Sequence, residues 1–163
     1  MNNLILIGMP ASGKSTIGVV LAKTLGMDFT DTDLIIQKRE GKLLQQIIDE
    51  EGLKKFLKAE QDAILSIEAE NTVIATGGSA VLSDKAMRRL KDFGKIIYLY
   101  ADCKILEKRL YNIETRGIAK EKNESVIEIF DKRKDLYKKY ADITIEAGNF
   151  SVEQIVKIIL KNI

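Results

Sequence analysis

The chain has 163 residues, a length typical of one domain, and 45% of them are hydrophobic, which is enough for a buried core. A net charge of +2 does not indicate a surface for nucleic acids, and the absence of histidine excludes Ser-His-Asp triads and histidine-bound zinc. The single cysteine, Cys103, cannot form an internal disulfide, and no stretch resembles a signal peptide or a membrane span. These features predict a cytoplasmic protein with no nucleic-acid or membrane partner.

A phosphate-binding loop of the form G-x-x-x-x-G-K-[ST] spans residues 8–15. It follows a short apolar run typical of a buried strand and precedes a helical pattern, which is the context that the motif requires. Loop N–H groups and the helix N-terminus attract phosphate oxygens, Lys14 is expected to reach the β- and γ-phosphates, and the Ser15 hydroxyl is expected to bind Mg²⁺. The loop therefore predicts a nucleoside triphosphate and Mg²⁺ as cofactors. The predicted nucleotide-binding residues are Gly8, Ala11, Ser12, Gly13, Lys14, Ser15 and Thr16.

Strand-like and helix-like patterns alternate along the chain. Strands are predicted at residues 4–7, 27–30, 72–75, 95–100 and 142–146. Helices are predicted at residues 16–25, 33–51, 53–68, 84–93, 104–112, 124–140 and 151–162. Gly41 is expected to break the second helical stretch, and Ser83 and Gly94 to cap the helix between them. The alternation predicts an α/β fold, a doubly wound parallel sheet in a single domain.

Polar residues follow the second and third predicted strands. Asp31 and Asp33 come after the second strand, and Gly77 and Gly78 after the third. Parallel sheets bind ligands at the carboxyl ends of their strands, so one aspartate can hold Mg²⁺ and the other can orient or deprotonate a substrate hydroxyl. The alternatives are that an aspartate only caps the next helix and that the glycines only form a tight turn.

Three arginines are candidates for charge stabilisation. Arg116 lies in a polar stretch between two helices, where a mobile loop can bring a guanidinium to the transferred phosphoryl group. Arg109 and Arg133 lie on predicted helices. From the pattern alone, a solvated surface role remains open for each of the three.

Several motifs together resemble the shikimate kinase family. They are the phosphate-binding loop, Phe29-x-Asp31-x-Asp33, Arg39-Glu40-Gly41, Thr76-Gly77-Gly78, Arg116 and Arg133-x-x-Leu136-Tyr137. The resemblance covers nearly the whole chain and implies the nucleoside monophosphate kinase fold, a three-layer α/β/α sandwich whose five-stranded parallel sheet has the order 2-3-1-4-5. It implies one P-loop kinase domain over residues 1–163, with substrate-binding helices at about 34–70 and a lid at about 112–123. The implied reaction is transfer of the ATP γ-phosphate to the 3-hydroxyl of shikimate, in aromatic amino-acid biosynthesis.

The resemblance also implies a role for each matching residue. Lys14, Asp33 and Arg116 are the expected catalytic residues, and Ser15 and Asp31 the expected metal ligands. Arg109 is expected to lie against the adenine. The expected substrate-binding residues are Asp33, Gly77, Gly78, Arg133 and Lys58.

The chain departs from the family pattern mainly on the substrate side. Leu57 stands where the family has an arginine that grips the shikimate carboxylate together with the equivalent of Arg133. The neighbouring Lys58 projects about 100° further round the helix and is the candidate to compensate. Ser79 replaces a third glycine, and Gly117-Ile118 replaces Pro-Leu in a short lid.

These departures leave alternatives open. The chain is expected to be a monomeric kinase that acts on shikimate or a similar hydroxy acid. The alternatives are a kinase of the same fold for another hydroxylated molecule, such as a sugar acid or polyol, a nucleoside monophosphate kinase, and a nucleotide-binding protein without catalysis. A monophosphate kinase needs several arginines for its second nucleotide, and residues 34–70 contain only Arg39.

Overall fold

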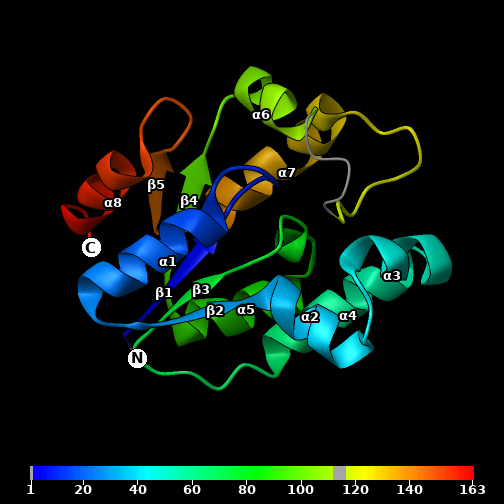
Figure 1. Ribbon diagram of the computed structural model, residues 1–163, viewed down its shortest axis with the longest axis horizontal. Coiled ribbons are helices and arrows are strands. Elements are labelled where there is room, and N and C mark those ends of the chain that lie inside the picture. The colour runs from blue at the N-terminus through cyan, green and yellow to red at the C-terminus, as the bar shows by residue number, and fades with distance from the viewer. Residues whose placement is uncertain (1, 112–116) are drawn as a thin grey trace.

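Five parallel strands form a sheet with helices on both faces in the computed structural model, which describes residues 2–111 and 117–163 (Figure 1). The strands are β1 (Asn3–Ile7), β2 (Asp28–Asp31), β3 (Thr72–Ala75), β4 (Gly94–Tyr100) and β5 (Ile143–Glu146). Their order is β2-β3-β1-β4-β5, which confirms the predicted fold. The phosphate-binding loop follows the central strand β1, so its neighbours on one side are the residues that follow β3.

The helices are α1 (Lys14–Leu25), α2 (Thr32–Glu40), α3 (Leu44–Glu51), α4 (Leu53–Leu65), α5 (Asp84–Phe93), α6 (Cys103–Leu110), α7 (Val126–Tyr140) and α8 (Val152–Leu160). Helices α1 to α7 lie between successive strands along the chain, and α8 follows β5. Side chains of β1 alternate between the two faces of the sheet, as the pleat requires. Leu4 and Leu6 pack with α1 and α8, whereas Ile5 and Ile7 pack with α4, α5 and α7. The sheet is therefore the middle layer of three.

Helices α2, α3 and α4 form a lobe beyond the end of β2, and α4 also packs on the sheet through Ile64 (Figure 1). Its own apolar cluster includes Ile36, Ile47, Phe56 and Ala63. Ala119, from the predicted lid at about 112–123, packs against the same cluster. This contact closes the lobe over the carboxyl ends of the strands, which is where ligands bind in this class of fold.

Some predicted boundaries changed for local reasons. Gly41 does end α2, because its φ of 65° is left-handed and favours glycine. Helix α4 ends at Leu65, three residues before the predicted end. Gly94 caps α5 through its N–H but also begins β4, where an added Cβ would lie 2.3 Å from the carbonyl oxygen of Asn3. A short 3₁₀ turn at Ala80–Leu82 was not predicted.

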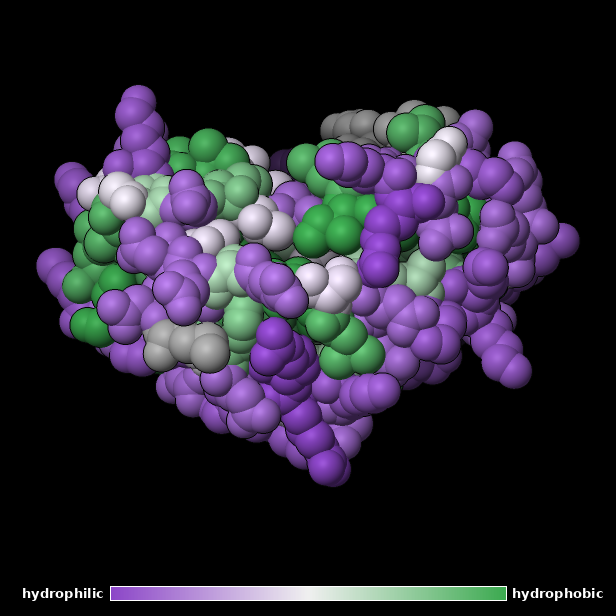
Figure 2. Space-filling model, turned by 90° about the horizontal axis from the view of Figure 1, so that it is seen from below, coloured by the Kyte–Doolittle hydropathy of each residue, from purple (hydrophilic) through white to green (hydrophobic). Residues whose placement is uncertain are grey.

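The surface of the described residues is mixed in polarity. On the face shown in Figure 2, hydrophobic side chains lie in small groups among hydrophilic ones. Within residues 2–111 and 117–163, every helix is too short or too polar to cross a lipid bilayer.

Candidate active site

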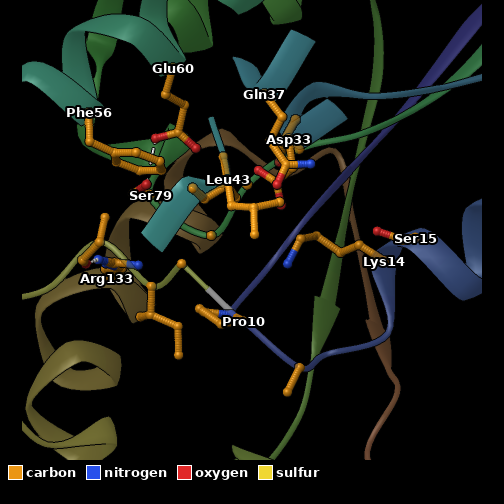
Figure 3. A pocket seen from close by; sticks show the side chains of 18 of the residues that line it. Pro10, Lys14, Ser15, Asp33, Gln37, Leu43, Phe56, Glu60, Ser79 and Arg133 are labelled. Atoms are coloured by element: carbon orange, nitrogen blue, oxygen red, sulfur yellow. Dashed lines mark hydrogen bonds between the residues drawn. The ribbon is translucent and has the colours of Figure 1, made fainter. Parts of the chain in front are cut away.

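A cavity of about 310 Å³ lies at the carboxyl end of the sheet, between the phosphate-binding loop and the α2–α4 lobe (Figure 3). Its volume is within the range of small-molecule sites. Figure 3 shows Lys14, Asp33 and Arg133 turned toward this common space, although they come from α1, α2 and α7. The other lining residues are Pro10, Ala11, Gly13, Ser15, Thr16, Gln37, Leu43, Leu44, Phe56, Glu60, Thr76, Gly77, Gly78, Ser79, Gly117, Ile118 and Ala119.

The phosphate-binding loop has a backbone that only glycine accepts easily. Gly8 and Gly13 have φ values of 149° and 94°. The loop curls around the ammonium group of Lys14, which donates hydrogen bonds to the carbonyl oxygens of Gly8 at 2.8 Å and Met9 at 2.9 Å. Helix α1 begins at Lys14, and its first three residues, Lys14, Ser15 and Thr16, line the cavity, so the positive end of the helix dipole faces it. The cavity wall is therefore electropositive where a phosphate would lie.

Asp31 carries out two tasks at the end of β2. Its Oδ1 accepts a hydrogen bond from the N–H of Asp33 at 2.9 Å and caps α2. Its Oδ2 accepts a hydrogen bond from the Ser15 hydroxyl at 2.6 Å. The capping role that the sequence left open is therefore real, and it fixes the other carboxylate oxygen beside Ser15.

The Ser15 and Asp31 oxygens suit a hard cation that keeps most of its ligands from phosphates and water, as Mg²⁺ does. No group of three or more histidine, cysteine, aspartate or glutamate residues that could form an all-protein metal cage occurs among the described residues. The donor set therefore fits Mg²⁺ bound together with a nucleotide.

Asp33 and the two glycines form the next part of the wall. An added Cβ on Gly77 would lie 3.0 Å from Asp33 Oδ1 and 2.2 Å from Glu60 Oε1, so only glycine lets these carboxyl groups come so close. The Gly77 N–H donates to the Thr32 hydroxyl at 3.1 Å, and the Gly78 carbonyl accepts from Tyr137. The glycines shape the cavity, and part of their backbone polarity is used within the protein.

Arg133 is buried on the face of α7 that turns toward the cavity, with 4% of its surface exposed. One guanidinium nitrogen, Nη2, donates to the Ala119 carbonyl. One turn further along α7, Tyr137 stacks on Tyr98 at 5.0 Å between ring centroids and donates to the Gly78 carbonyl at 2.6 Å. Burial raises the pKa of Tyr137, so it remains a neutral donor. These contacts fix the orientation of α7 and hold a buried cation at the cavity wall.

Glu60 is the residue of this site that the sequence prediction missed. It lies on α4 with 2% of its surface exposed, and its Oε2 accepts a hydrogen bond from the Ser79 hydroxyl at 2.5 Å. Burial raises its pKa to about 7, and the charge of Asp33 acts in the same direction. The signal was a glutamate within the apolar stripe of α4, since Phe56 and Ala63 share its buried face.

Two predicted residues do not reach the cavity wall. Arg109 lies beside the loop, where its guanidinium donates to the carbonyls of Ala11 at 3.0 Å and Gly148 at 3.3 Å. Lys58 lines the second cavity described below rather than this one, and it forms an ion pair with Asp62 at 2.5 Å. The structure thus does not bring Lys58 to Arg133, because the 100° step along the helix turns it away.

The remaining predicted residues have different positions. Gly8 and Ser12 lie in the phosphate-binding loop beneath the cavity, where the Ser12 hydroxyl accepts from Lys14 at 3.4 Å. Arg116 lies outside the described residues. Leu57 borders a second cavity of about 280 Å³, which shares Glu60 and Ser79 with the first.

The fold and the cavity define a P-loop phosphotransferase of the nucleoside monophosphate kinase type, with a nucleotide side and an acceptor side. Comparison with known families matches residues 10–163 to "Shikimate kinase". The shikimate kinase of Bacillus anthracis is 34% identical over 156 residues, which cover 95% of this chain and 94% of that protein. That of Thermodesulfovibrio yellowstonii is 36% identical over 164 residues, with 99% and 94% covered.

Solved structures agree. The shikimate kinase from Acinetobacter baumannii in complex with shikimate superposes with a TM-score of 0.92 at 28% identity, covering 99% of this chain and 92% of that chain. The chain belongs to the shikimate kinase family, whose members use ATP to phosphorylate an alcohol group.

Proposed function

We propose that this enzyme phosphorylates the 3-hydroxyl of shikimate in the 310 Å³ cavity. The observation that carries the proposal is that one cavity contains Lys14 and Ser15 on one side and Asp33 and Arg133 on the other. A cation is thereby available for the phosphates, a second cation for an acceptor carboxylate, and a carboxylate for an acceptor hydroxyl. A molecule that carries both a carboxylate and neighbouring hydroxyls suits this arrangement.

In the proposed reaction, Asp33 orients the acceptor hydroxyl and takes its proton. The hydroxyl oxygen bonds to the γ-phosphorus while the bond from that phosphorus to the β–γ bridging oxygen breaks, and ADP leaves. Lys14 balances charge on the β- and γ-phosphates throughout, and Arg116 is proposed to do so from the lid. Arg109 is proposed to lie against the adenine.

The acceptor is proposed to lie against Gly77 and Gly78 with its carboxylate on Arg133. Mg²⁺ is proposed to bind through Ser15 and Asp31, where it would neutralise phosphate charge. The hydrogen bond between these two residues supports this, because it already holds both oxygens on one side of the nucleotide site. A cytoplasmic location and a monomeric state stay predictions.

The test is an assay of ADP formation with Mg-ATP and a panel of acceptors: shikimate, a sugar acid, a polyol and a nucleoside monophosphate. We expect efficient turnover with shikimate and little with the others. Faster turnover of another acceptor would replace shikimate while keeping the kinase assignment. Nucleotide binding without turnover of any acceptor would support a binding protein instead.

A further inference from the structure

Two buried polar atoms in the acceptor side of the cavity have no hydrogen-bond partner in the described part of the chain. They are Glu60 Oε1 and Arg133 Nη1. Both residues line the same cavity and are at least 96% buried, since their exposed fractions are 2% and 4%. Buried polar groups are nearly always paired, so this acceptor and this donor indicate groups that a ligand satisfies.

The environment of Glu60 disfavours its negative charge. Ser79, after β3, donates one hydrogen bond that favours the charged form, but Asp33, on α2, contributes a repulsive charge that disfavours it (Figure 3). Arg133, on α7, and Lys14, on α1, act in the opposite direction from a distance, but Glu60 forms no ion pair with any described residue. Burial is the largest effect, and it brings the pKa of Glu60 to about 7.

Leu57 supplies no cation that could form an ion pair with Glu60. It precedes Glu60 by one helical turn and borders the second cavity together with Glu60 and Ser79, and Lys54 and Lys58 line that cavity as well. An aliphatic side chain there supplies neither charge nor hydrogen bond. Lys58, the neighbouring cation, is held by Asp62 and is exposed. An anionic acceptor that binds Arg133 therefore places a negative charge near the carboxyl group of Glu60. Because the pKa of that group is already raised to about 7, the added charge favours its protonated form.

We propose that Glu60 takes up a proton from solvent when the acceptor binds and donates it in a hydrogen bond to the acceptor carboxylate on Arg133. This rests on the proposed function, because it requires an acceptor that carries a carboxylate. The neutral carboxyl group of Glu60 then donates a second hydrogen bond to the acceptor carboxylate, beside that from Arg133. In the family pattern, the arginine at position 57 would supply this second bond. The affinity for the acceptor therefore depends on whether Glu60 is protonated.

The proposal predicts the direction in which the affinity for the acceptor changes with pH. Proton uptake on binding means that affinity is highest where Glu60 is already protonated and falls as pH rises through the pKa of the free enzyme. With that pKa at about 7, the dissociation constant for shikimate should rise about tenfold between pH 6 and pH 8. An ionised Glu60 that accepted a hydrogen bond from the acceptor would give the opposite trend.

The experiment is isothermal titration calorimetry of the full chain with shikimate and ADP at pH 6, 7 and 8, in buffers of different ionisation enthalpy. We expect the tenfold loss of affinity and, between pH 7 and pH 8, the uptake of a substantial fraction of one proton. In E60Q, the amide donates without titrating, so affinity should stay nearly constant and proton uptake should disappear. In L57R, the new cation keeps Glu60 ionised, so pH dependence should also disappear.

The control is E68Q, which makes the same change at an exposed glutamate outside both cavities. It should keep the wild-type pH dependence. Shikimate binding that is independent of pH in the wild-type enzyme, or E60Q with unchanged proton uptake, would overturn the role of Glu60 while leaving shikimate as the acceptor. Absence of shikimate binding at every pH would instead overturn the acceptor and the proposal with it.

Discussion

The nucleotide side and the acceptor side of the cavity are built differently. Eight consecutive residues, 8–15, provide most of the nucleotide side, and its donors are largely backbone groups and a helix N-terminus. The acceptor side combines Asp33, Glu60, Ser79 and Arg133, from four segments of the chain. Its donors and acceptors are side chains, and two of their atoms lack a partner within the described residues.

This difference shows where specificity can change. A backbone-built site depends on loop geometry and tolerates few sequences, because Gly8 and Gly13 require left-handed or unusual φ values. A side-chain-built site can alter one member and keep its fold. Leu57 is such an alteration, since it stands one helical turn before Glu60 where the family pattern has an arginine. We therefore expect the nucleotide side to determine the type of reaction and substitutions on the acceptor side to change which acceptor binds.

The largest effect is expected on the nucleotide side. K14A should lower kcat by about 10³-fold, because it removes the ammonium that balances phosphate charge. The fold should be kept, since the Lys14 ammonium donates hydrogen bonds to loop atoms, the carbonyls of Gly8 and Met9 and the Ser12 hydroxyl. ADP formation and circular dichroism measure the two outcomes. K23A, at the exposed far end of α1, is the matched control, and unchanged turnover in K14A would contradict the assignment.

Substitutions of Asp31 and Asp33 test the region where the nucleotide side and the acceptor side of the cavity meet. D33N should lower kcat by roughly 10²-fold with nucleotide affinity nearly unchanged, because it removes the base for the acceptor hydroxyl. D31N should still cap α2, since asparagine caps as well as aspartate, but should need more Mg²⁺ for half-maximal activity. Titration of Mg²⁺ at saturating ATP distinguishes the loss of kcat in D33N from the higher Mg²⁺ requirement of D31N. If both variants show the same metal-dependent defect, the division of roles is wrong.

The pH dependence of unfolding tests the raised pKa of Glu60 in the absence of any ligand. The pKa of Glu60 is raised from 4.5 to about 7 on folding, so the folded state loses stability as pH rises from about 4.5 to 7. E60Q avoids this loss and should increase the free energy of unfolding at pH 8 by roughly 2–3 kcal/mol. At pH 5 the gain should be below about 1 kcal/mol. Urea unfolding at both pH values measures it, and an equal gain at both would argue against the shifted pKa.

Restoring a cation at position 57 should have a smaller effect. L57R should tighten shikimate binding at pH 8 by about 1.5 kcal/mol, or roughly tenfold, as expected for one charged hydrogen bond. The gain is at the lower end of such values because the arginine would also pair with Glu60. The measurement is kcat/KM for shikimate, with L57M as the uncharged control. No gain, together with efficient wild-type turnover, would show that residue 57 does not face the carboxylate.

The smallest effect is expected at Lys58. K58A should change KM for shikimate by less than about twofold, because its ammonium pairs with Asp62 outside the cavity. The helix should lose only about 0.3–0.5 kcal/mol from that exposed pair. A large rise in KM would instead show that Lys58 turns inward when the acceptor binds, as the sequence suggested.

The sequence by itself determined the features that depend on neighbouring residues. The phosphate-binding loop, the alternation of strands and helices, and the break at Gly41 each follow from local spacing and backbone preference. Asp31 and Asp33 were also predictable, because they directly follow a strand whose end must lie beside the loop. The family resemblance supplied the strand order, which no single segment encodes.

Only the tertiary structure decided the electrostatics of the acceptor side. The spacing within α4 indicates that Glu60 shares a face with apolar residues, but not that Ser79 and Asp33 lie against it or that Lys58 turns outward to Asp62. Desolvation and Coulomb interactions depend on distances between groups that are far apart in the chain. The charge of a buried carboxyl group is therefore set by the packing of α2, α4, α7 and the end of β3, and it becomes readable only after these elements are assembled.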